Sequence, residues 1–104
     1  LEANVTSRLY PNADVLFAFV RSIKGETLET LQRKAQFSVS VIGNSIEITP
    51  EKSLSPRFES YEKLSAVLTQ LRETHSFQMS DYQKVSFNSS YDLALVKRWQ
   101  QHQG

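Results

Sequence analysis

The chain has 104 residues, with 12 Lys and Arg against 11 Asp and Glu and a formal net charge of +1. Its length fits one domain, and a hydrophobic content of 39% is too high for a disordered chain. The absence of cysteine excludes a disulfide framework, a thiolate nucleophile and a cysteine-based zinc site.

The N-terminal part of the chain is polar and irregular. We therefore expect residues 1–12 to form a flexible segment before a single globular domain over residues 13–99. The stretch DVLFAFVRSI carries apolar residues at intervals that fit either a strand face or a helix face. Pro11-Asn12 before this stretch and Gly25 after it are typical of the two ends of a helix, so we predict a helix here.

The clearest pattern is a pair of alternating segments, FSVSVI and SIEIT, separated by Gly43-Asn44. A two-residue turn at this point places Val41 opposite Ile46 and Val39 opposite Ile48. The apolar faces of the two strands then coincide, as an antiparallel hairpin requires. The segment ETLETLQRK that precedes the hairpin is predicted to be extended.

Two further helices are predicted in the C-terminal half. A polar loop leads to Ser60, which can cap a helix with an apolar stripe at three- and four-residue intervals. The last helix is expected to begin at Asn88 or Ser89, with Ser89 and Asp92 in the spacing of a capping box. Residues 100–104 are expected to fray. These elements predict a small α+β domain, an antiparallel hairpin or short sheet packed against about three helices.

The sequence offers little support for an enzyme. Glu47 and the pair Glu51-Lys52 suggest a metal-dependent nuclease, but the spacing within that pair is wrong for one. His75 and His102 are far apart, and no phosphate-binding loop or metalloprotease motif occurs. We therefore expect no catalytic activity, no metal and no cofactor.

The sequence also bears on location. No apolar run approaches the roughly 20 residues of a membrane helix, and the first residues lack the pattern of a signal peptide. We therefore expect no membrane association and a cytoplasmic location. The chain does not begin with Met, so whether it is a fragment of a larger protein stays open.

Four cations flank the two outer ends of the hairpin. Arg33 and Lys34 precede it, while Lys52 and Arg57 follow it, and a hairpin brings its outer ends together. Ser60 and the first N–H groups of its helix add donors for a phosphate oxygen. The near-neutral net charge argues against binding over a broad surface, so this local rim is the predicted contact with nucleic acid. Its alternative role is only to solubilise the ends of the hairpin.

The start of the last helix is predicted to form a second contact with phosphate, for which helix capping is the alternative role. Its residues are Asn88, Ser89, Ser90 and Tyr91. The leading hypothesis is thus a non-catalytic nucleic-acid-binding module that contacts the phosphate backbone, with DNA favoured over RNA.

A competing hypothesis is a protein-interaction or assembly domain of a larger bacterial protein. It depends on apolar side chains that fall in predicted loops, where they would be exposed to a partner. These are Phe58, Phe77, Met79 and Tyr82.

Overall fold

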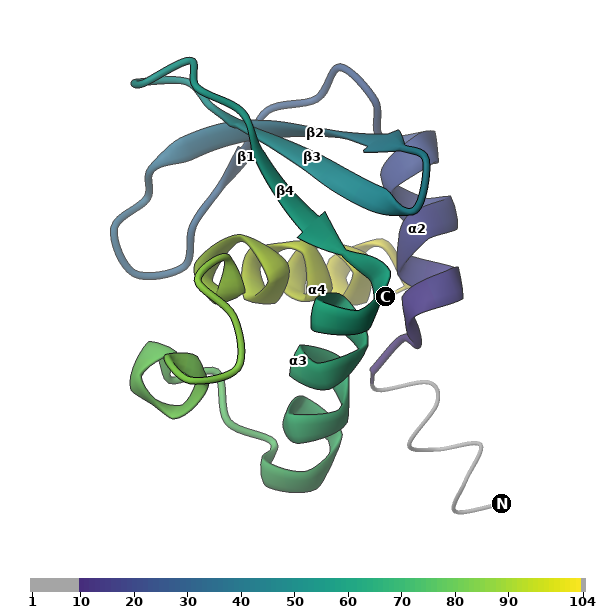
Figure 1. The fold of residues 1–104 in the computed structure, drawn as a ribbon, viewed down its shortest axis with the longest axis vertical. Coiled ribbons are helices and arrows are strands. Elements are labelled where there is room, and N and C mark those ends of the chain that lie inside the picture. Colours follow the sequence, from purple (N-terminus) through teal and green to yellow (C-terminus); the bar gives the residue numbers. More distant parts are fainter. Residues whose placement is uncertain (1–9, 104) are drawn as a thin grey trace.

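The computed structural model describes residues 10–103 of the chain. It contains a four-stranded antiparallel sheet with the strand order β1-β2-β3-β4, and helices cover one face of this sheet (Figure 1). The elements are α2 (Ala13–Ser22), β1 (Leu28–Glu29), β2 (Gln36–Ile42), β3 (Ser45–Pro50), β4 (Arg57–Ser60), α3 (Tyr61–Thr74), the 3-10 helix η1 (Met79–Tyr82) and α4 (Ser89–Gln103). The predicted α+β class is confirmed.

The central hairpin has the predicted register. Val39 lies opposite Ile48 and Val41 lies opposite Ile46, with Gly43 at a φ of 58° in the turn between β2 and β3. Glycine adopts this left-handed conformation without steric cost. The extended segment predicted before the hairpin is reduced to β1, a two-residue strand that pairs with β2.

The strand β4 was not predicted, because its residues were assigned to a polar loop. In the structure Arg57 pairs with Ile48 and Ser60 pairs with Ser45, so β4 runs antiparallel to β3 along the edge of the sheet. The sequence RFES lacks the apolar alternation of a half-buried strand, since its buried residue is Glu59. Pairing with β3 therefore defines this strand, and local pattern does not.

One hydrophobic core joins the sheet to the helices. Each layer supplies fully buried side chains, such as Val20 of α2, Ile48 of β3, Leu68 of α3 and Val96 of α4. The predicted helix over α2 is confirmed, and the side chain of Asn12 caps it by accepting a hydrogen bond from the Val15 N–H at 2.8 Å. Within residues 10–103, no helix has the length and apolar character needed to cross a membrane.

The predicted flexible segment over residues 1–12 is only partly described. Residues 1–9 lie outside the described part of the chain. Tyr10 and Pro11 are buried, and the Tyr10 hydroxyl lies 2.8 Å from Nδ1 of His75 at the end of α3. The packed part of the domain therefore begins before residue 13.

The structure describes residues 100–103 of the tail that was expected to fray. The helix α4 continues to Gln103. The ring of His102 lies 5.5 Å from the ring of Phe19 in α2, so the last turn has a tertiary contact that the sequence pattern did not reveal.

Ser60 caps α3, and its loss should cost stability. Its Oγ accepts a hydrogen bond from the Lys63 N–H at 3.2 Å. We expect Ser60→Ala to lower the free energy of unfolding by about 1 kcal/mol, the usual effect of removing an N-cap. Urea unfolding would measure this, with Thr69→Ala on the exposed side of the same helix as a control that should cost little. Equal stability of the two variants would contradict the capping role.

Candidate nucleic-acid interface

Arg33 and Arg57 line the same cleft, although they are distant in the sequence. The cleft has a volume of about 660 Å³ and lies between the β1–β2 connection, the start of β4, the segment around η1 and the start of α4. Ser90 and Tyr91 of α4 also line it, whereas none of its described lining residues is Asp or Glu. We call it the arginine cleft.

A short hydrogen-bonded loop positions Arg33. The N–H of Thr30 donates to the carbonyl of Ala35 at 3.0 Å, and the N–H of Ala35 donates back to the Thr30 hydroxyl at 3.0 Å. The N–H of Lys34 also donates to the carbonyl of Thr30 at 3.2 Å. These bonds close the loop around the turn that carries Arg33, whose side chain is exposed.

The register of β4 explains the position of Arg57. Paired residues of neighbouring strands share a face of the sheet, and Arg57 pairs with Ile48, which is fully buried beneath the helices. Arg57 therefore points to the helix-covered face, where its guanidinium carbon lies 5.7 Å from the centre of the Tyr91 ring. Cation–π attraction favours this position. Tyr91 is held in turn by an edge-to-face contact with Phe37, with ring centres 4.9 Å apart.

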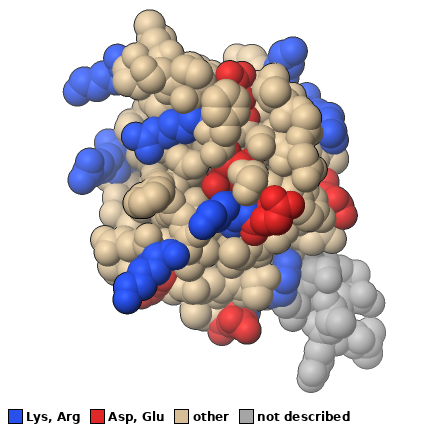
Figure 2. Space-filling view, viewed as in Figure 1, with Lys and Arg blue, Asp and Glu red and all other residues tan. Residues whose placement is uncertain are grey.

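Among the described residues, neither arginine of the cleft has a carboxylate partner. Within the described range, residues 10–103, the structure records one ion pair, which joins Arg98 to Glu26. Figure 2 shows Lys and Arg side chains spaced along the left edge of the molecule, on the side where Figure 1 places the β1–β2 and β3–β4 connections. This margin can therefore attract an anion despite the near-neutral net charge of the chain.

Lys52 also lies at this end of the sheet but does not line the arginine cleft. It is exposed in the turn that follows β3. The neighbouring Glu51 N–H donates to the carbonyl of Gln36 at 2.9 Å, which keeps the end of β3 beside the start of β2. The outer ends of the hairpin thus meet in the predicted way.

Lys34 faces a different hollow from Arg33. This second hollow has a volume of about 330 Å³ and is also lined by Glu29 and by Lys97 of α4. Thr30 and Leu31 line both hollows, so the two adjoin. Lys34 has a φ of 58°, a left-handed conformation that turns the chain at the boundary between the two hollows.

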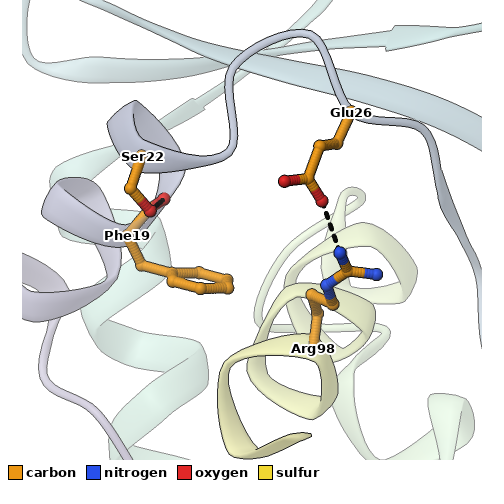
Figure 3. A network of polar contacts seen from close by, with 4 residues as sticks. All are labelled: Phe19, Ser22, Glu26 and Arg98. Carbon is orange, nitrogen blue, oxygen red and sulfur yellow. Dashed lines mark hydrogen bonds and ion pairs between the residues drawn. The ribbon is translucent and has the colours of Figure 1, made fainter. Parts of the chain in front are cut away.

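Arg98 lines the second hollow as well, but its charge is matched. Figure 3 shows its guanidinium pointing to the Glu26 carboxylate on the loop after α2. On that helix, the Ser22 hydroxyl donates to the carbonyl of Phe19 at 2.7 Å. Both partners of the ion pair are half-exposed, so the pair adds little stability. Arg98 is therefore a neutralised cation in this hollow. Lys34 and Lys97 also line it, and neither has a carboxylate partner among the described residues.

The predicted contribution of Ser60 to the cationic rim is wrong. Ser60 pairs with Ser45 at the start of β3, and the N–H of Tyr61 donates to the carbonyl of Asn44 in the hairpin turn at 3.1 Å. Ser60 therefore lies at the opposite end of the sheet from Lys52. The error follows from the unpredicted β4, which carries the chain back along β3 before the helix begins.

The structure places the four residues of the predicted contact at the start of α4 differently. Ser90 and Tyr91 line the arginine cleft, but Ser89 is buried and cannot present its hydroxyl to a ligand. The side-chain amide of Asn88 donates to the carbonyl of Phe58 at 3.2 Å, which ties the start of α4 to β4. Asn88 therefore links α4 to β4 and does not itself line the arginine cleft.

The four apolar residues of the competing hypothesis do not form one exposed surface. Phe77 and Met79 are partly buried and line the arginine cleft, while Phe58 is exposed on the open face of the sheet. Tyr82 is fully buried, and its hydroxyl donates to the carbonyl of Ser76 at 2.6 Å. The prediction that Tyr82 is an exposed contact is wrong, because η1 turns this ring into the core.

A buried pair of carboxyl groups lies next to the interface, and the sequence did not indicate it. Glu59 and Asp92 are almost wholly inaccessible, and the Ser86 hydroxyl donates to Glu59 at 2.6 Å. No donor among the described residues reaches either oxygen of Asp92, so it does not complete the predicted capping box. Burial, and next the neighbouring Glu59 carboxyl group, raise the pKa of Asp92 well above its usual value.

Comparison of the chain with protein-family models, curated proteins and solved structures finds no match. The functional conclusion therefore depends on the geometry of the site. Its central feature is the meeting in one cleft of two arginines that have no carboxylate partner among residues 10–103.

Proposed function

We propose that the chain is a non-catalytic nucleic-acid-binding module that contacts the phosphate backbone through the arginine cleft, with DNA as the favoured ligand. The observation that carries the proposal is that Arg33 and Arg57 line one cleft that has no Asp or Glu among its described lining residues. Guanidinium groups form charge-assisted, often bidentate hydrogen bonds with phosphate oxygens. Two such groups in one hollow suit a backbone that carries a phosphate at every nucleotide.

The neighbouring cations extend the contact on both sides. Lys34 and Lys97 line the adjoining hollow, and Lys52 is exposed at the same end of the sheet. With a formal net charge of +1, the protein supplies only this local attraction, so binding should be moderate and strongly dependent on salt. A cytoplasmic location and a role as an accessory part of a larger bacterial protein belong to the same proposal.

The test is the double substitution Arg33→Ala with Arg57→Ala. We expect it to weaken DNA binding by about tenfold or more, and to reduce the slope of log affinity against log salt by about 1 for each phosphate that the protein no longer neutralises. Fluorescence anisotropy with a labelled oligonucleotide over a salt series measures both quantities.

The matched control is Arg21→Ala with Lys24→Ala, which removes two exposed cations at the end of α2, outside both hollows. Both double variants should unfold at the same denaturant concentration as the parent. If the cleft variant binds with the affinity and salt slope of the parent, the proposal is wrong.

A protein-interaction or assembly domain is the second candidate. The observation in its favour is Phe58, which is 54% exposed on the open face of the sheet. Self-assembly through this face would appear as concentration-dependent sedimentation, whereas the nucleic-acid module should sediment as a monomer in the absence of ligand.

A further inference from the structure

We infer that the ligand is a single strand, with one nucleotide in the arginine cleft and the base of a neighbouring nucleotide stacked on Phe87. This inference rests on the proposed function and adds to it the strandedness of the nucleic acid and a contact that the sequence did not suggest.

Phe87 is the first observation behind this inference. Its side chain is 93% exposed, which leaves a large apolar ring in water. The residues on either side of it are held in place. Ser86 is buried and bonds to Glu59, and Asn88 bonds to the Phe58 carbonyl. The loop thus holds the ring outward between two anchored residues, in the manner of a stacking platform.

The ring is close to the arginine cleft. Phe87 precedes the cleft residue Ser90 by three positions, so their Cα atoms are at most about 11 Å apart. A strand that leaves the cleft beside Ser90 therefore passes within reach of the ring. The cationic hollow and the exposed aromatic ring together provide the two contacts that single-stranded nucleic acid requires, one for phosphate and one for a base face.

The interior of the cleft suits a nucleotide. Its volume of about 660 Å³ falls within the usual range of sites that enclose small molecules. Gln32, Gln78 and Gln83 line it, and their amide groups offer both donors and acceptors to the edge of a base. In a duplex the bases are paired at their edges and stacked on both faces. An unpaired nucleotide can therefore enter this cleft or stack on Phe87, whereas a base inside a duplex can do neither.

The experiment compares fluorescein-labelled oligothymidylate and oligouridylate of about 12 nucleotides with a duplex of the same length, a size within the span of known single-strand sites. We expect the single strands to bind the parent protein about tenfold more tightly than the duplex does. Phe87→Ala should weaken single-strand binding by about tenfold and leave the salt slope unchanged, because an aromatic ring displaces no counterions. Phe87→Trp should retain the affinity of the parent.

The matched control is Val15→Ala, which shortens another exposed apolar side chain on α2, outside the cleft. It should bind like the parent. Thymidine monophosphate should displace the oligothymidylate only at far higher concentration than unlabelled oligothymidylate does. Equal potency of the two competitors would identify a small-molecule site and overturn the inference.

The outcomes separate this inference from the proposed function. If the Arg33→Ala, Arg57→Ala double variant loses binding while Phe87→Ala does not, or if the duplex binds as tightly as the single strands, the inference fails and the proposed function stands. If no nucleic acid binds the parent protein, both fail together.

Discussion

Asp92→Asn should make the stability of the domain less dependent on pH than that of the parent protein. Asp92 is fully buried, and burial together with the neighbouring Glu59 carboxyl group raises its pKa well above the usual value. An Asn side chain has nearly the size and shape of the protonated acid and is likewise uncharged. The variant therefore fills the same buried position with a group that cannot lose a proton.

The direction of the effect follows from where the proton is bound. In the unfolded chain Asp92 releases its proton near pH 3.9, whereas in the native protein it holds that proton to a higher pH. Between these two pKa values the native state binds more protons than the unfolded state, so the stability that Asp92 contributes falls as pH rises. That contribution is fully present below about pH 3.9. The loss is at most about 1.4 kcal/mol per pH unit for one proton.

Urea unfolding over a range of pH provides the measurement, with the fluorescence of the buried Trp99 as the signal. The free energy of unfolding of Asp92→Asn should exceed that of the parent by an amount that grows from about pH 4 upward. Glu51→Gln changes an exposed carboxyl group and should follow the pH profile of the parent. If the free energies of unfolding of Asp92→Asn and the parent changed with pH in parallel, Asp92 would not have a raised pKa in the native protein.

Tyr82→Ala should be among the most destabilising single substitutions in this domain. The ring is fully buried in the hydrophobic core, so its removal leaves a cavity and should cost about 3–5 kcal/mol of unfolding free energy. Tyr82→Phe keeps the ring and loses only the hydrogen bond to the Ser76 carbonyl, at a cost of about 0.5–1.5 kcal/mol.

Denaturant unfolding of these variants distinguishes the core role of Tyr82 from a role in partner binding. Phe58→Ala serves as the aromatic control, because its ring is 54% exposed and should contribute little to stability. The expected order of destabilisation is Tyr82→Ala, then Tyr82→Phe, then Phe58→Ala. A Tyr82→Ala variant as stable as Phe58→Ala would mean that the ring is not part of the core.

The sequence determined those features that depend on residues near one another in the chain. Alternating apolar residues on either side of Gly43 specified the register of β2 and β3. Apolar spacing and the polar caps Asn12 and Ser60 specified α2 and α3. These signals are local because a turn and a helix cap involve residues only a few positions apart.

Contacts between distant segments depend on the folded arrangement and could not be inferred from local pattern. Nothing local in RFES revealed that β4 pairs with β3, and this pairing removes Ser60 from the cationic margin while it places Arg57 beside Tyr91. The burial of Asp92 against Glu59 and of Tyr82 in the core is decided in the same way. A polar or aromatic residue is buried by side chains from other segments of the chain. Its own neighbours in the sequence do not encode which of those segments pack against it.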